Sequence, residues 1–143
     1  MEIKVYELED FIEFLLDFEL KGKDSRLRTR LVGLLSNRLE MSRQEHSDLL
    51  LEYCKKDEDG NPVTNEVEDG RTAYKIDDME EYQRQYFYLM NEDFYIEEGK
   101  DREEMLKYVK QLILNTDKTF KGEEALKYDR WCEIAESIKY EVD

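Results

Sequence analysis

Residues 20–54 read LKGKDSRLRTRLVGLLSNRLEMSRQEHSDLLLEYC, and they decide the fold because apolar side chains recur through them at helical spacing. Gly22 ends any helix before it, and Asp24 or Ser25 can cap a new first turn, so a helix is predicted from about Ser25 to Cys54. Its apolar seam follows steps of three and four: Leu31, Leu35, Leu39, Ser42, His46, Leu49 and Tyr53. Some 30 residues make a rod of about 45 Å, which is long for a chain of this size.

A β-hairpin is expected where the rod ends. Residues 63–67 and 72–76 flank Asp69-Gly70, a dipeptide that favours the left-handed backbone of a tight turn. The sequence therefore predicts a small hairpin at the tip of the rod.

A second helix is expected after the hairpin. Asp77 or Asp78 can cap it, and Met79 to Asn91 repeat apolar residues on one face. The second helix spans only about 20 Å, so it returns along less than half of the rod.

Three shorter helices are left to cover the rest of the rod. They begin near Asp10, near Asp101, which with Glu104 resembles a capping box, and after Gly122. The last of these helices is expected to direct Leu126 toward the core. We therefore expect one domain over 1–143 of mainly α (α+β) class, a long helical hairpin with a small β-hairpin at its tip, packed against three shorter helices. A minor two-stranded sheet, pairing residues 94–96 with 3–5, remains an option.

The charge of the chain restricts its partners. It has 143 residues, 37 of them acidic and 22 Lys or Arg, for a net charge of −15. Such a chain repels DNA, RNA and anionic lipid and favours a basic protein surface. It has no apolar run near the roughly 20 residues that cross a bilayer, and its amino terminus is acidic where a signal peptide is basic. We expect no direct nucleic acid partner, no membrane and a cytoplasmic location.

No pattern in the sequence supports catalysis. The chain has one histidine, His46, and two isolated cysteines, so a zinc set would need distant ligands. Residues 57–68 place acids in a calcium-loop frame, but Pro62 stands where that loop needs glycine. No Gly-rich loop follows a strand. We expect no enzyme, no catalytic residue, no cofactor and no metal.

A basic block opens the rod. The ten positions from Lys21 to Arg30 carry a local charge of +4, which leaves −19 for the other residues. The block is a candidate site for an anion or an acidic partner, and the alternative is that it pairs with the chain's own carboxylates. The candidate residues are Lys21, Lys23, Arg26, Arg28 and Arg30.

An acidic and aromatic run from Asp77 to Glu104 forms a second candidate surface. It holds too many aromatics in succession for all to face one core, and exposed tyrosines are effective interface anchors. The alternative is a solvated acidic face over an aromatic core. The candidate partner-binding residues are Tyr82, Tyr86, Tyr88, Glu92, Asp93, Tyr95, Glu97 and Glu98.

Three segments also carry a family resemblance. LKGKDSRLRTRLVGLL (20–35), the helix ending in YCKKDEDGNP (53–62) and KGEEALKYDRWCE (121–133) resemble a domain-of-unknown-function family of small proteins from phages and prophages of Gram-positive bacteria. The resemblance assigns no activity or site residue, but it implies a phage context.

In that context the expected function is a phage-encoded, non-enzymatic binding protein. It would occupy a basic surface of a host or phage protein, for example a defence protein, through its acidic aromatic face, in the cytoplasm of the bacterial host. The alternative is a structural or assembly protein of the phage particle, such as a tail or baseplate part or an assembly chaperone. For that role the seam of the rod would serve to form a homo-oligomer, and the chain would enter the virion.

Overall fold

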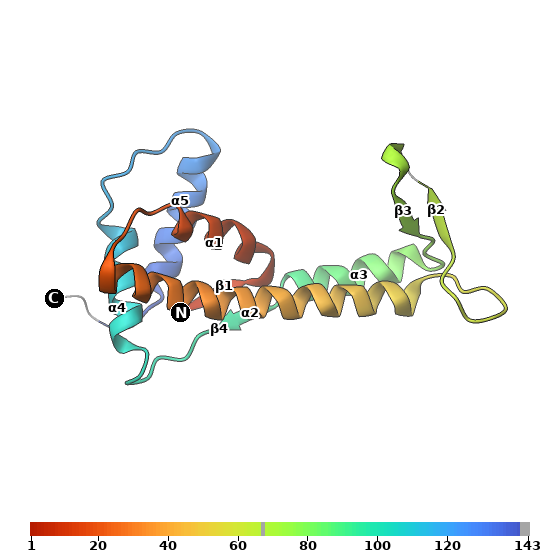
Figure 1. The fold of residues 1–143 in the computed structure, drawn as a ribbon, viewed down its shortest axis with the longest axis horizontal. Helices are drawn as coiled ribbons and strands as arrows, with labels where there is room; N and C mark the ends of the chain where they lie inside the picture. Colours follow the sequence, from red (N-terminus) through yellow and green to blue (C-terminus); the bar gives the residue numbers. More distant parts are fainter. Residues whose placement is uncertain (67, 141–143) are drawn as a thin grey trace. The chain divides into compact units, whose positions relative to one another are not determined.

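A computed structural model describes residues 1–66 and 68–140, and helices make up most of that part of the chain. The elements, in order, are β1 (Glu2–Lys4), η1 (Val5–Glu7), α1 (Leu8–Leu16), α2 (Gly22–Tyr53), β2 (Thr64–Glu66), η2 (Glu68–Gly70), β3 (Thr72–Tyr74), α3 (Met79–Met90), β4 (Asp93–Tyr95), α4 (Glu103–Leu114) and α5 (Glu123–Glu136). Two antiparallel pairs, β1 with β4 and β2 with β3, add a minor β part. The predicted mainly α fold with its long helix is confirmed (Figure 1).

The chain divides into two compact units, which we describe separately. Unit 1 comprises Met1–Leu39 and Asp93–Asp143, and unit 2 comprises Glu40–Glu92. The boundaries fall inside α2 and just before β4. The single domain expected for 1–143 stays a prediction.

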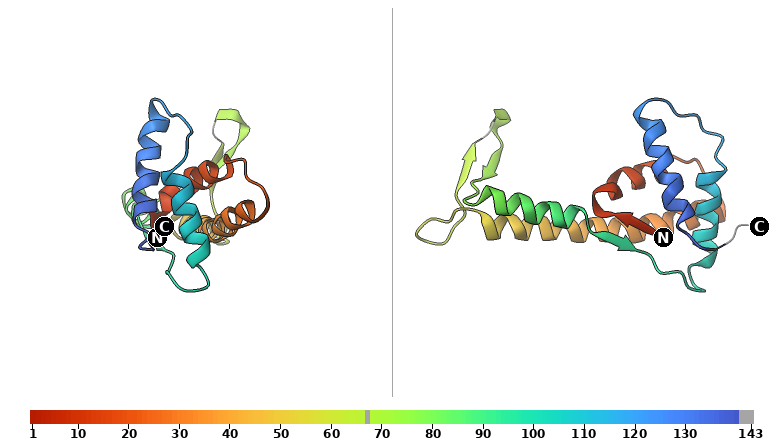
Figure 2. Two further views of the ribbon diagram at one scale, coloured as in Figure 1. Left: turned by 90° about the vertical axis from the view of Figure 1, so that its left-hand side faces the viewer. Right: turned by 180° about the vertical axis from the view of Figure 1, so that it is seen from behind.

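Unit 1 holds most of the buried apolar side chains. In Figure 2, α4 and α5 lie side by side, and α1 lies close to them. The Phe11 and Trp131 rings lie 5.0 Å apart, which joins α1 to α5. Each helix buries residues three, four or seven positions apart, the spacing of one helical face. The most deeply buried include Phe11, Leu15, Leu31, Leu35, Leu106, Val109, Ile113 and Ile134.

The ends of unit 1 are held by polar contacts of high sequence separation. Ile3 pairs with Phe94 in the β1–β4 register, and the amino group of Met1 donates to the Ile96 carbonyl at 3.1 Å. The buried Glu7 carboxylate accepts two hydrogen bonds from Arg130, at 2.7 and 3.0 Å. The minor two-stranded sheet considered from the sequence is therefore confirmed, although its strands, Glu2–Lys4 and Asp93–Tyr95, each begin one residue earlier than predicted.

Three local predictions in unit 1 were wrong. The helix α2 begins at Gly22, which can adopt its φ of +58° because glycine has no Cβ. Asp24 and Ser25 therefore lie inside the first turns of α2 and do not precede it. Arg102 precedes α4 with no side-chain cap, so the box from Asp101 does not form. Leu126 is 75% exposed, because five residues along a helix place it about 140° from the buried Trp131.

Unit 2 is a helical arm that carries a β-hairpin. In Figure 1, α3 runs beside the second half of α2, and β2 and β3 lie at their end. Backbone bonds close that end, since Lys55 donates to the Lys75 carbonyl and Asp77 to that of Tyr53. Asp69 and Gly70 both have positive φ, 80° and 71°, as the turn prediction required. Val67, the end of the first predicted strand, lies outside the described residues.

Candidate protein-binding face of α3

Local sequence fixes where α3 starts and stops. The Asp78 carboxylate accepts a hydrogen bond from the Glu81 amide at 3.1 Å, which satisfies a free donor of the first turn. At the other end the Asn91 side chain donates to the Phe87 carbonyl at 2.9 Å. The predicted cap and the predicted helix are both confirmed.

One side of α3 closes the arm. Nε2 of His46 and the hydroxyl of Tyr82 lie 2.8 Å apart, and the His46 ring lies 4.8 Å from that of Tyr86. Burial raises the pKa of Tyr82, so this phenol stays a neutral hydrogen-bonding group. His46 is therefore a seam residue, and Tyr82 contacts it inside the arm.

The adjoining side of α3 is apolar and open to solvent, and Tyr86 lies at the border between the two sides. Met79, Tyr86 and Phe87 are exposed, Phe87 to 61%, and steps of seven and eight residues place them on one helical face. We call these three residues the α3 stripe. The candidate residues of the sequence included only Tyr86 of the three, although the spacing from Met79 was a readable signal. Tyr88 is also exposed, but it lies about 200° around the helix from Tyr86.

The other half of the predicted face belongs to unit 1. Asp93 forms an ion pair with Lys4 at 2.7 Å. Tyr95 is exposed and lies opposite Glu2 in the β1–β4 register, and the negative charge of Glu2 raises the pKa of Tyr95. The Glu98 carboxylate accepts the backbone amides that follow α5, at 2.5 and 3.2 Å. Glu97 is exposed. Glu98 thus has an internal structural role.

Tyr82, Tyr86, Tyr88 and Glu92 lie in unit 2, so the eight predicted residues divide evenly between the units. Glu92 is exposed at the end of unit 2.

The basic block divides into structural and exposed members. Nη1 of the buried Arg28 donates to the carbonyls of Leu15 and Phe18, both at 2.8 Å, and so satisfies the end of α1. Lys23 forms an ion pair with Glu104 of α4. Lys23 thus shows the pairing with the chain's own carboxylates that was considered from the sequence, whereas Arg28 is held by backbone carbonyls instead.

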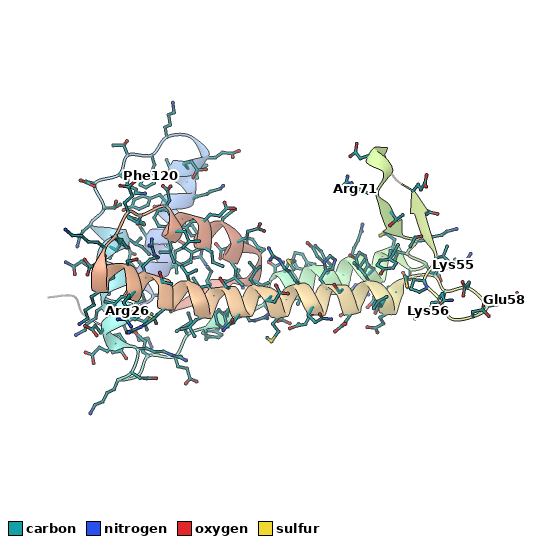
Figure 3. The ribbon with its side chains drawn as sticks, viewed as in Figure 1. Arg26, Lys55, Lys56, Glu58, Arg71 and Phe120 are labelled. Atoms are coloured by element: carbon teal, nitrogen blue, oxygen red, sulfur yellow. The ribbon has the colours of Figure 1, made fainter. Side chains whose placement is uncertain are left out.

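Lys21, Arg26 and Arg30 are exposed and form no ion pair within the described part of the chain. Arg26 projects from the first turns of α2 (Figure 3). With Lys23 and Leu27, Arg26 and Arg30 line a shallow cleft of about 360 Å³. Three uncompensated cations near a helix amino end are unfavourable for the helix dipole.

The described residues contain no group of three or more His, Cys, Asp or Glu side chains placed to hold a metal ion. A cleft of about 750 Å³ between the carboxyl ends of α1 and α4 has Tyr108 and Lys118 in its lining but no described histidine or cysteine. No helix in the described part of the chain is long and apolar enough to cross a membrane.

Comparisons with known proteins add no relative. No protein-family model, no curated protein and no solved structure matches the chain.

Proposed function

We propose that the chain is a phage-encoded, non-enzymatic binding protein that occupies a basic surface of a host or defence protein as an inhibitor or modulator. The observation that carries this proposal is the exposure of the α3 stripe in a unit with few buried apolar side chains. Fully burying one large apolar side chain contributes about 1.5–3 kcal/mol. A partner that covers Met79, Tyr86 and Phe87 therefore gains several kcal/mol before the costs of association.

The charge of unit 2 selects the kind of partner. Its 53 residues include 15 acids and six bases, for a net charge of −9. Such a surface repels a second acidic protein and speeds encounter with a basic one, in a manner that salt screens. The stripe would then set the lifetime of the complex and the charges its rate of formation.

The test begins with capture from host lysate by tagged protein, washed at low and at about half-molar salt. A captured basic protein is then purified, and its affinity is measured for the wild type and for Phe87→Ala. We expect high salt to weaken binding and Phe87→Ala to weaken it by about 30-fold, the effect of a central interface residue.

Leu126→Ala is the matched control, because Leu126 is also a large exposed apolar residue but belongs to unit 1 and lies outside the α3 stripe. It should bind as the wild type does. The proposal is contradicted if the affinity of the captured partner changes neither with salt nor with Phe87→Ala. It is also contradicted if no salt-sensitive partner is captured from the lysate.

A second candidate function is a structural or assembly role in the phage particle. Met41 and Leu51 are exposed apolar residues of α2 in unit 2, and their spacing places them on the same half of the helix. They could pack against another copy of the chain. Light scattering would then show a defined homo-oligomer that Met41→Asp dissociates, whereas a monomeric wild type excludes this role.

A further inference from the structure

Unit 1 contains a small cleft with an aromatic floor and an acidic rim. It lies between one face of α1, the segment 118–120 and one face of α5, and its volume is about 270 Å³. Its floor is formed by Phe14, Phe120 and Trp131, and Phe120 lies beside α5 at this place (Figure 3). All of its lining residues belong to unit 1, so it is separate from the α3 stripe.

The floor presents packed aromatic rings. The Phe14 ring lies 6.2 Å from that of Phe120 and 6.1 Å from that of Trp131. Trp131 is buried and the two phenylalanines are half-buried, so their rings are held in place. The face of such a ring attracts a cation, most strongly where water is partly excluded.

The rim carries more negative than positive charge. Four carboxylates line the cleft with only two lysines, Lys118 and Lys127. Lys118 lies 2.9 Å from the Asp17 carboxylate, whereas Lys127 stands 3.6 Å from Asp10 and 3.5 Å from Glu124, beyond a normal hydrogen bond. Glu13 has no side-chain partner among the described residues. The cleft therefore has a net charge of −2, and the Glu13 carboxylate can accept hydrogen bonds from a ligand.

We propose that this cleft binds an arginine side chain presented by a partner protein. Its volume is below the roughly 300–1,000 Å³ of small-molecule pockets, which suits one inserted side chain. A guanidinium is favoured over an ammonium, because it is planar, stacks on aromatic rings and donates two parallel hydrogen bonds to a carboxylate. Tyr128 stacks on one face of the Phe120 ring, with ring centroids 4.3 Å apart. In the proposed arrangement the guanidinium stacks on the other face of Phe120 and donates to Glu13 and Glu124.

The only tryptophan of the chain lines this cleft, so its fluorescence reports on the occupant. The probes are the acetylated, amidated peptide Gly-Arg-Gly-Arg-Gly and its counterparts with lysine or with citrulline, the uncharged isostere of arginine. Each is titrated into the full chain at low ionic strength. We expect a saturable Trp131 response to the arginine peptide, a several-fold weaker affinity for the lysine peptide and no response to the citrulline peptide.

Variants locate the response. The double variant Glu13→Gln, Glu124→Gln should bind the arginine peptide with about tenfold lower affinity, since each exposed ion pair contributes up to about fivefold in affinity. Glu123→Gln, an exposed neighbour outside the lining, should leave the affinity unchanged. Phe87→Ala should also leave it unchanged, which separates this site from the α3 stripe.

Three results would each overturn the proposal. The first is no saturable response to the arginine peptide, and the second is an equal response to the citrulline peptide. The third is an affinity that Glu13→Gln with Glu124→Gln does not change more than Glu123→Gln does.

Discussion

Arg28 stabilises unit 1, although the sequence places it in a basic block that suggests a binding site. It is only 8% exposed, and its guanidinium donates to two carbonyls at and just beyond the end of α1. A helix leaves its last carbonyls without partners, and a cation there also complements the helix dipole. The burial could not be predicted because it depends on where the carboxyl end of α1 lies in space.

We predict that Arg28→Ala lowers the free energy of unfolding by about 2–4 kcal/mol, because two partly buried carbonyls lose a charged donor. Arg26→Ala, an exposed neighbour of the same type, should change it by less than about 0.5 kcal/mol. Urea unfolding followed by circular dichroism measures both. Equal effects of the two substitutions would show that Arg28 has no special structural role.

Ionisation of Tyr128 is expected to lower the stability of unit 1 at alkaline pH. Burial is the main cause that raises its pKa to about 12, from the usual 10.0, and its hydroxyl donates to the Ile113 carbonyl at 2.7 Å. The folded chain thus keeps a proton that the unfolded chain releases above pH 10. The stability from this group is complete below pH 10 and is lost as the pH rises from 10 to 12.

Tyr128→Phe removes that titration. We expect the variant to be about 1 kcal/mol less stable near pH 8, because the hydrogen bond to Ile113 is lost. Between pH 10 and 12 the free energy of unfolding of the variant should then fall less steeply with pH than that of the wild type. The difference in slope corresponds to at most one proton released on unfolding. Urea unfolding at several pH values measures the slopes, and parallel curves would contradict the assignment.

At the scale of elements, the sequence predicted what local geometry determines. The start of α3 was correct because Asp78 satisfies its own first turn, a contact within four residues. The predicted start of α2 at about Ser25 was wrong, because Gly22 can begin the helix with a positive φ at which another residue would be strained. The face of α3 that stays exposed was missed because neighbours distant in sequence decide which side of an amphipathic helix is covered.

The Asp78 cap should therefore determine the local stability of α3. Asp78→Ala is expected to cost about 1 kcal/mol, while Asp78→Asn, which keeps an acceptor, should cost much less. Asp77→Ala is the control, because the Asp77 side chain makes no described hydrogen bond although it carries the same charge. Helix content during thermal unfolding measures the three variants, and an equal loss in Asp77→Ala would point to net charge instead of capping.

At the scale of the molecule, buried apolar surface is distributed unevenly. Among the described residues, Cys54 and Leu89 are the only buried apolar side chains of unit 2, and the others belong to unit 1. The sequence showed an apolar seam along the whole rod, but Leu49 and Tyr53 are only half-buried. The sequence could not show this difference, because the number of elements that cover each part of a helix is a tertiary property.

This difference predicts unequal protection from hydrogen exchange. Local opening costs least where few apolar contacts are lost. Amides of α3 and of α2 beyond Glu40 should therefore exchange faster than those of α1, α4 and α5 in the free chain. A partner that covers the α3 stripe should slow exchange in α3 and leave α5 unchanged, because binding stabilises only the states that it contacts. Exchange followed by mass spectrometry measures each helix, and uniform protection of α3 and α4 in the free chain would show that unit 2 needs no partner to be fully stable.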